Sequence, residues 1–582
     1  MLFCLSICLT LLLLAGCNGV DIEDINDVDP DPDEYTLEMM EVEGQGEVEP
    51  DVGTHTFDPD TLVDLLVTPD TGWEFDEWAG PDSGDVVAVN IEDGEYRIEM
   101  DSNKEIYPIF KTNILLVPSQ YSTIQEAIDA SDHGDKVIVD QGIYKENINL
   151  NGKNITIRST DPEDPDIVET TVIDGDDDGQ TITINSGETE DALIYGFKIT
   201  GGNAGDRNYG GGILIAHSSS PIIKGNIITE NIAGRGAGIY VNDQSSPTIK
   251  NNIFIENDST SRWGAAIYVR DNSEVLIQDN ILRDHTEVRG VIAIGSSSTD
   301  NCIATISGNT IENNFSDYGT GGIHVSGSDV VIDNNTFTNN IGDGAGIDAG
   351  GAISVIHNSS VEINDNTFTN NSASQFGAIV IGDESSAKIK DNTITDNVAG
   401  EFGEGGSGGG ISINDTELEE IIISGNTIID NTAGNAGGGL YIRETQNIVI
   451  EENEISNNKS YRFGGGIDLR GHGFDSDVIA TIINNTISEN EVEGHRNARG
   501  GGILVRNIQE ATIYGNKIDN NFAGEHGGGI YIFDEIPVFA SENIPWDRSN
   551  CPPDDHNYND FSDNSHGDNQ YGGADVFFAE NR

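Results

Sequence analysis

The hexapeptide Asn366-Thr367-Phe368-Thr369-Asn370-Asn371 contains the pattern that decides the fold of this chain, Asn-x-apolar-x-x-Asn. The pattern occurs twelve times, and its third residue is apolar in every copy. The first asparagines are Asn226, Asn252, Asn280, Asn309, Asn335, Asn366, Asn392, Asn426, Asn453, Asn485, Asn516 and Asn559. The sixth residue is asparagine in eleven copies and His285 in the remaining one. Successive copies lie 26 to 34 residues apart, except for a last interval of 43, so the chain is a repeat array.

A second element lies between the asparagine patterns. It is a glycine run followed by alternating apolar residues, as in Gly210–Ile215, Gly437–Ile442 and Gly527–Ile532. No repeat contains a sustained 3.6-residue period, so each consists of two or three short strands without a crossover helix. Such a unit buries its apolar side chains by stacking as a coil on its neighbours, with parallel strands about 4.8 Å apart.

The fold class predicted from these two elements is all-β, a right-handed parallel β-helix solenoid of about 12–14 coils, judged from twelve repeats and the flanking sequence. The right hand follows from the strong preference of parallel crossovers. Glycine permits left-handed corners, and stacked asparagine amides can hydrogen-bond from coil to coil. We therefore expect the twelve asparagines to form one continuous column.

The start of the array has its own pattern. Leu115–Val117 is predicted to be a strand, and Thr123–Ala130 a short amphipathic helix with Ser122 or Thr123 as its N-cap. This opening resembles the N-terminal cap of the pectin-lyase-like β-helix superfamily, and the resemblance implies that the helix covers the open end of the first coil. The repeats also resemble the motifs of polymorphic outer-membrane proteins, for example in Gly350-Gly351-Ala352-Ile353, and that family contains adhesins.

The N-terminal segment reads as a targeting signal. Leu2–Gly16 is almost wholly apolar but too short to span a bilayer comfortably. The sequence Leu14-Ala15-Gly16-Cys17 resembles a bacterial lipobox, which implies that Cys17 is acylated and that the lipid anchor is the only contact with the membrane. The implied localisation is a secreted, membrane-anchored lipoprotein at the cell surface or outer membrane.

Between leader and array, residues 35–112 alternate short β-type runs with turns. The stretches Gly44–Pro50, Gly72–Trp78 and Met100–Lys104 resemble the internalin-type B-repeat module of bacterial surface proteins. The expected segments are a lipoprotein signal peptide at 1–17, an acidic tether at 18–34, this small β domain at 35–112, and the β-helix at 113–582 with an insertion at 534–556.

The charge balance restricts the possible partners. The chain has 28 Lys and Arg residues against 101 Asp and Glu, a formal charge of −73, which disfavours nucleic acid as a partner. Such a charge favours a saline habitat, because salt screens self-repulsion; bound Ca²⁺ would be another way to relieve it. Of the five cysteines only Cys302 and Cys551 lie in the array, many coils apart, so we expect no disulfide framework.

Alternation within the strand after each glycine run predicts a row of side chains that point away from the core. The candidate ligand-binding residues belong to this row or to the position two residues after it. They are Tyr240, Tyr268, His324, Tyr441, Arg443, Arg470, Arg506 and Tyr531. Stacked tyrosines suit a sugar-binding groove; the alternative is a simple β-compatible face exposed to solvent. Arg270 and the three other arginines suit carboxylate recognition, either of a uronic acid or of nearby Asp and Glu.

Catalysis has few candidates. Gly471-His472-Gly473 matches a polygalacturonase tripeptide, but the partner motifs of that family are missing. The candidate catalytic residues are Tyr441, Asp468 and His472, since a lyase needs a base and a means of neutralising the uronate.

One acidic stretch could hold Ca²⁺. Asp174, Asp176 and Asp178 have the spacing of the first half of a Ca²⁺ loop, but Asn185 stands where an EF-hand requires glutamate. The alternative is a plain turn after a strand. Ca²⁺ is the only cofactor that the sequence suggests.

Three functions fit this sequence. The first is a surface-anchored lipoprotein that binds carbohydrate or a partner surface, as an adhesin does. The second is a polysaccharide lyase or glycoside hydrolase acting on uronic-acid polymers, and the third is a passive surface spacer. Fold alone does not choose among them.

Overall fold

The computed structural model describes residues 34–582 with several gaps. The gaps are residues 71, 92, 287–288, 345, 402, 404, 472–477, 495–496, 534–537, 542–543, 546–559, 563, 567–575 and 580–582. Cys17, Cys551 and His472 therefore lie outside the described residues, as does most of the expected insertion. The chain divides after Asn113 into two compact units.

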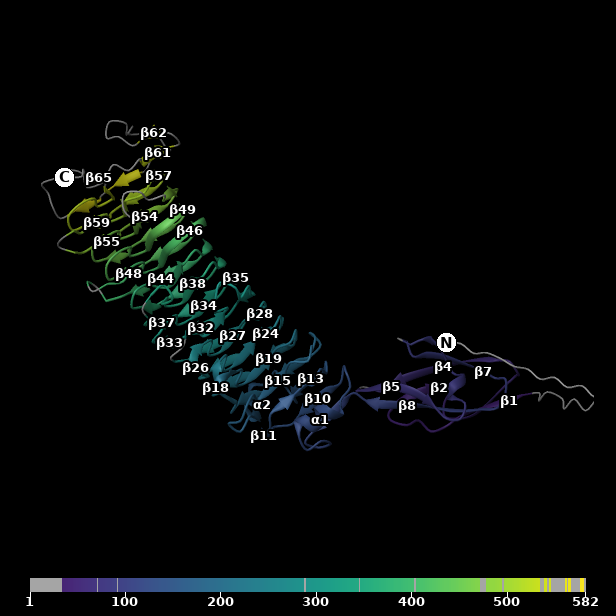
Figure 1. Ribbon diagram of the computed structural model, residues 1–582. Coiled ribbons are helices and arrows are strands. Elements are labelled where there is room, and N and C mark those ends of the chain that lie inside the picture. Colours follow the sequence, from purple (N-terminus) through teal and green to yellow (C-terminus); the bar gives the residue numbers. More distant parts are fainter. Residues whose placement is uncertain are drawn as a thin grey trace, which may run out of the picture. The chain divides into compact units, whose positions relative to one another are not determined.

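The first unit contains two four-stranded sheets, drawn in purple in Figure 1. Its strands are β1 (Tyr35–Met39), β2 (Gly46–Glu49), β3 (Gly53–Phe57), β4 (Leu62–Pro69), β5 (Trp73–Ala79), β6 (Val87–Asn90), β7 (Glu95–Glu99) and β8 (Lys104–Thr112). The sheet orders are β3-β1-β8-β5 and β2-β4-β7-β6. The core between them includes Leu37, Leu65 and Met100, and both Trp73 and Trp78 pack against it.

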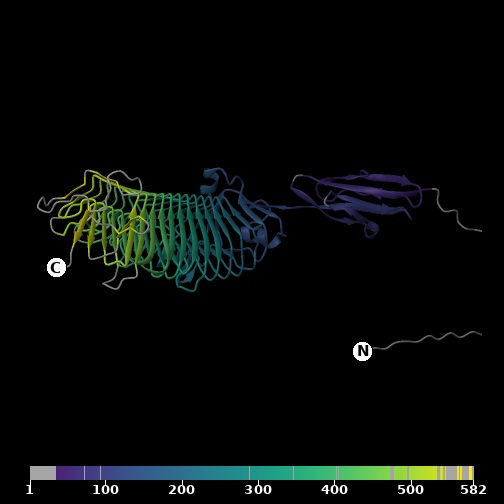
Figure 2. The ribbon, with the colours of Figure 1, turned by 90° about the horizontal axis from the view of Figure 1, so that it is seen from above.

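The second unit is a right-handed parallel β-helix of about 13 turns, which confirms the predicted fold class. One coil consists of β39 (Ser360–Asn364), β40 (Thr367–Thr369), β41 (Ser372–Ala373) and β42 (Ile379–Gly382). Each pairs in parallel with its equivalent in the next coil: β43 (Ser386–Lys390), β44 (Thr393–Thr395), β45 (Val398–Ala399) and β46 (Ile411–Ser424). Figure 2 shows the coils from the side as a regular series of rungs.

Alternation in these strands fills the interior with one continuous column of apolar side chains. In β42, for example, Ile379 and Ile381 belong to the core, whereas Val380 points to the other side of the sheet. The strands that follow the glycine runs stack from β12 (Ile148–Asn149) through β42 to β65 (Val576–Ala579), and we call this stack the glycine-run face. It carries most of the candidate site residues.

The repeated asparagines form the predicted column, confirmed for eleven of the twelve; Asn559 lies outside the described residues. Asn366 shows the arrangement: its Nδ2 donates to the Ile332 carbonyl at 2.8 Å and to Asn392 Oδ1 at 3.0 Å. Its own Oδ1 accepts from the backbone N and Nδ2 of Asn335. Each buried amide is thus satisfied by the coils above and below, which removes the cost of burying it.

The sixth positions of the pattern form a second buried column. Its members are Asn231, Asn257, His285, Asn314, Asn340, Asn371, Asn397, Asn431, Asn458, Asn490, Asn521 and Asn564. His285 takes a place in this ladder: its Nδ1 lies 3.1 Å from Asn314 Oδ1, and its Nε2 lies 3.5 Å from Asn257 Nδ2. The ring therefore fits as the neutral tautomer with the proton on Nδ1.

Two helices flank the early coils. α1 (Ile124–Ala130) is the predicted cap, and its N-cap Thr123 accepts a hydrogen bond from the backbone N of Glu126. Its buried face joins the core of the coils, so the first coil is closed off from water. α2 (Pro165–Thr170) precedes β14 (Thr171–Asp174). None of the described helices is long and apolar enough to cross a membrane.

The melting temperature of the purified protein is expected to rise by several degrees between low salt and 1 M NaCl. The physical reason is the formal charge of −73, whose self-repulsion is screened once the Debye length falls to about 3 Å. Calorimetry at a fixed pH tests this, with an uncharged osmolyte of equal osmolality as the control. A melting temperature that does not respond to NaCl or to Ca²⁺ would contradict it.

Candidate functional site

The candidate residues of the glycine-run face are centred on seven of its strands. These are β23 (Ile239–Val241), β27 (Ile267–Val269), β34 (Ile323–Ser326), β49 (Leu440–Glu451), β52 (Ile467–Arg470), β56 (Ile503–Arg506) and β60 (Ile530–Phe533). As predicted, Tyr240 and Tyr268 stay out of the interior core and form a separate cluster with Ala293. The expectation that this row faces solvent is wrong. Tyr268, His324 and Asp468 are 0% exposed, and Tyr240, Tyr441 and Tyr531 are buried as well.

The physical reason lies in the glycine run before each strand. At Gly437 the backbone has a φ of 63°, and an added Cβ would lie 2.8 Å from Cβ of Tyr441. The chain therefore turns back tightly over the outer side of its own strand. The residues that lead into these turns stack on one another and cover the row beneath; we call them the cover column. Its members are Tyr209, Arg235, Trp263, Arg289, Phe376, Ser407, Ala436, Phe463, Arg499 and His526.

At the early coils the cover is mainly aromatic. The ring of Tyr209 stacks on Tyr240 at 4.6 Å, and Trp263 lies 6.0 Å from Tyr268 and 5.2 Å edge-on from His324. Burial lowers the pKa of His324 to about 3, helped by the Arg289 guanidinium, so this imidazole is neutral at physiological pH. His324 is thus part of the packing and does not present a charged group to a ligand.

The arginines stack in register. Arg443, Arg470 and Arg506 occupy equivalent positions of three successive coils. Arg443 pairs with Glu444 at 2.6 Å, and Arg470 pairs with the fully buried Asp468. Arg270, further down the same face, pairs with Asp300 at 3.2 Å and Asp271 at 3.5 Å. Three of the four candidate arginines therefore have intramolecular carboxylate partners.

Arg506 differs from the others. Among the described residues no carboxylate oxygen lies within 4.0 Å of its guanidinium, which lies over the Phe463 ring at 4.6 Å from its centre. Burial lowers the pKa of Arg506, and the neighbouring Arg470 lowers it further, although Asp468 opposes both effects. Arg506 is half-buried, and among the described residues no carboxylate forms a direct ion pair with it, so its guanidinium can bind an anion from outside.

A small pocket gives access to this cation. Its volume is about 120 Å³, and it is lined by Phe463, Asn497, Arg499, Leu504, Arg506, Asn507, Tyr531 and Phe533. Arg499 lies over the Tyr531 ring at 5.1 Å, and its buried Nε has no hydrogen-bond partner. The pocket thus combines two guanidinium groups with aromatic faces and side-chain amides, a set that suits a carboxylate on a sugar ring. Sequence reasoning missed Phe463 and Arg499; the signal was an aromatic or arginine residue four positions before the strands that begin at Ile467 and Ile503.

The catalytic candidates are poorly placed for proton transfer. Burial raises the pKa of Tyr441, so its hydroxyl keeps its proton, and Asp468 is buried and bonded to Arg470. His472 lies outside the described residues. Neither described candidate presents a base to a bound sugar.

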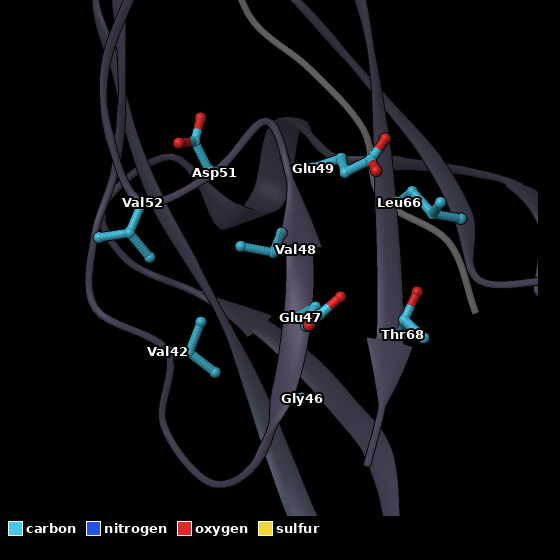
Figure 3. A pocket seen from close by; sticks show the side chains of 9 residues that line it. All are labelled: Val42, Gly46, Glu47, Val48, Glu49, Asp51, Val52, Leu66 and Thr68. Carbon is cyan, nitrogen blue, oxygen red and sulfur yellow. The ribbon is translucent and has the colours of Figure 1, made fainter.

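The acidic turn at Asp174 is partly neutralised from within, since Lys145 Nζ approaches both Asp174 and Asp176. In the described part of the chain no group of three His, Cys, Asp or Glu side chains could hold a metal ion. A larger pocket of about 380 Å³ lies in the first unit and is shown in Figure 3. Its rim carries Glu47, Glu49 and Asp51 around Val48, without a basic side chain among its lining residues.

Among solved structures the chain is similar to the Dettilon tailspike protein gp208 (13% identity, 72% of this chain, 68% of that chain, TM-score 0.27). It is also similar to PfbA, a surface adhesin of Streptococcus pneumoniae (13%, 76% and 88%, TM-score 0.24). A third is the A-module of the Azotobacter vinelandii mannuronan C-5 epimerase AlgE6 (12%, 79% and 94%, TM-score 0.21).

No curated protein matches the sequence. The model of the right handed beta helix region matches residues 141–306, 289–494 and 432–582, well over half of the chain. With the parallel coils and asparagine columns described above, this match establishes that the chain belongs to the right-handed β-helix family.

Proposed function

We propose that this chain is a surface-attached β-helix protein that binds an acidic carbohydrate at the pocket beside Arg506. The observation that supports this best is the pairing of a half-buried guanidinium, which has no carboxylate oxygen within 4.0 Å among the described residues, with a solvent-accessible pocket. A carboxylate there would accept charge-assisted hydrogen bonds from Arg506 and Arg499. The ring of Phe463 offers an apolar face to the sugar. A lipid on Cys17 would hold the protein at the membrane surface.

We favour binding over catalysis because of the protonation and the ion pairing of the candidate catalytic side chains. Tyr441 retains its proton and Asp468 already neutralises Arg470. A lyase would need a free base beside the uronate, and the described residues around the pocket supply none. A passive spacer, in turn, does not need a half-buried arginine beside a pocket that lacks a direct carboxylate partner among the described residues.

Arg506→Gln is expected to weaken binding of oligogalacturonate by about tenfold or more, since a hydrogen bond to a charged group contributes ~1.5–3 kcal/mol. Titration calorimetry measures this, with dextran as the uncharged probe. The matched control is Arg283→Gln, in which the lost arginine pairs with Asp284 on another face of the coils.

The same samples are monitored for the absorbance of an unsaturated product. Binding without product supports the proposal, and product formation would replace it with a lyase. Equal affinities of the wild type and Arg506→Gln, or no binding of any acidic oligosaccharide, would contradict the pocket as the site.

A further inference from the structure

The cover column contains the same order of side-chain types twice, an aromatic residue, an arginine and a second aromatic residue. Tyr209, Arg235 and Trp263 lie in register on β18 (Asn203–Tyr209), β22 (Ile232–Arg235) and β26 (Asp258–Trp263). Phe463, Arg499 and His526 lie in register in three later coils. We call the two triplets the N-terminal cluster and the C-terminal cluster. Each places an arginine between two aromatic rings along the axis of the β-helix.

The two central arginines are alike in a second respect. Within the described residues, neither Arg235 nor Arg499 has a carboxylate oxygen closer than 4.0 Å. Arg235 instead lies over the Tyr268 ring at 6.0 Å, as Arg499 lies over Tyr531 at 5.1 Å. Both are only partly buried.

The distance between them follows from the stacking. From β23, the strand after Arg235, to β56 (Ile503–Arg506), the strand after Arg499, there are nine steps along the glycine-run face. At about 4.8 Å a step, the two arginines lie ~43 Å apart along the axis. A single sugar unit cannot reach both, but an extended chain can.

The edge between the clusters is open. A pocket of about 520 Å³ lies there, lined by Asp343, Gly344, Ser374, Gln375, Phe376, Gly405, Gly406 and Ser407. Phe376 and Ser407 belong to the cover column, so the pocket continues the same line. Its polar lining and its one aromatic ring suit an uncharged sugar. Asp343, and Glu401 in the adjoining pocket, would repel an anionic one.

We propose that the ligand is an extended polysaccharide that lies along this edge and contacts both clusters, with acidic groups at the clusters and uncharged sugars between them. This inference rests on the proposed function and specifies its ligand. A densely charged polyanion is disfavoured by the acidic middle and by the net charge of −73. A polysaccharide with few acidic groups can place them at Arg235 and Arg499 and keep uncharged sugars beside the acidic middle of the edge.

The test uses carboxymethyl-dextran of low substitution, fractionated by length into chains shorter and longer than ~43 Å. Titration calorimetry compares the wild type, Arg235→Gln, Arg499→Gln and the control Arg283→Gln. The long fraction is expected to bind the wild type ~10²-fold more tightly than the short one, because the second contact is intramolecular. Arg235→Gln is expected to abolish this advantage of length and to leave the short fraction bound at the C-terminal cluster.

The outcomes separate the two proposals. If Arg235→Gln leaves the length dependence intact while Arg506→Gln weakens binding, the bridging ligand is refuted and the pocket remains. If neither substitution changes binding of any fraction, the proposed function fails as well. Tighter binding of fully charged polygalacturonate than of the sparsely substituted chain would refute the uncharged middle. Circular dichroism and melting temperature check that each variant is folded.

Discussion

Asn371→Asp is expected to destabilise the β-helix by about 3 kcal/mol or more, whereas Asn370→Asp should change its stability by less than about 0.5 kcal/mol. The two positions are neighbours in sequence, and the two substitutions add the same charge. Asn371 is 0% exposed within the second asparagine column, while Asn370 lies on the surface of the corner.

The reason lies in the direction of the hydrogen bonds. Asn371 Nδ2 donates to the Phe337 carbonyl at 3.0 Å and to Asn397 Oδ1 at 3.1 Å. An aspartate would place a second acceptor against both oxygens and bury a charge without a partner. At Asn370 the side chain makes no such contact, and Asp365 and Asp391 adopt the same left-handed conformation elsewhere in the array.

The two variants are compared with the wild type by urea unfolding at neutral pH. Hydrogen exchange then locates the loss, which should centre on the coils that contain Asn340 and Asn397, because coils interact mainly with their nearest neighbours. Equal unfolding midpoints for both variants would mean that the buried column contributes no more than the exposed corner, and would refute the account of the fold given above.

The columns could be predicted from the sequence because two independent patterns agreed. The spacing of the asparagines fixed the length of each coil, and the apolar third residue fixed which side faced inward. His285 interrupts the pattern without interrupting the column, because an imidazole has one donor and one acceptor at about the positions of an amide.

The site could be predicted only in part. Alternation correctly placed Tyr240 and Tyr268 outside the core, but it could not show that a preceding turn covers them. That cover depends on how tightly a glycine run turns back, which is a tertiary property. The sequence also left open whether Arg470 pairs with Asp468. The two residues are two positions apart, and whether their side chains meet depends on the geometry of the strand.

His285→Asn is expected to make the protein less sensitive to acid. Burial lowers the pKa of His285 from 6.5 to about 4, although Asn314 and Asp284 oppose this shift. As the pH falls below 6.5 the unfolded chain takes up a proton at this position, whereas the folded protein does not until about pH 4. The wild type therefore loses stability across this window, by about 3 kcal/mol in all from this residue.

Asparagine at position 285 would continue the column and remove the titrating group. The difference in unfolding free energy between His285→Asn and the wild type should therefore grow as the pH falls from 6.5 to 4, with each carboxylate contributing equally to both proteins. His217→Asn, at an exposed histidine outside the asparagine columns, is the matched control for the substitution itself. A difference that is the same at pH 7 and pH 4.5 would mean that His285 is charged in the folded state, which its contacts with Asn257 and Asn314 do not allow without breaking the ladder.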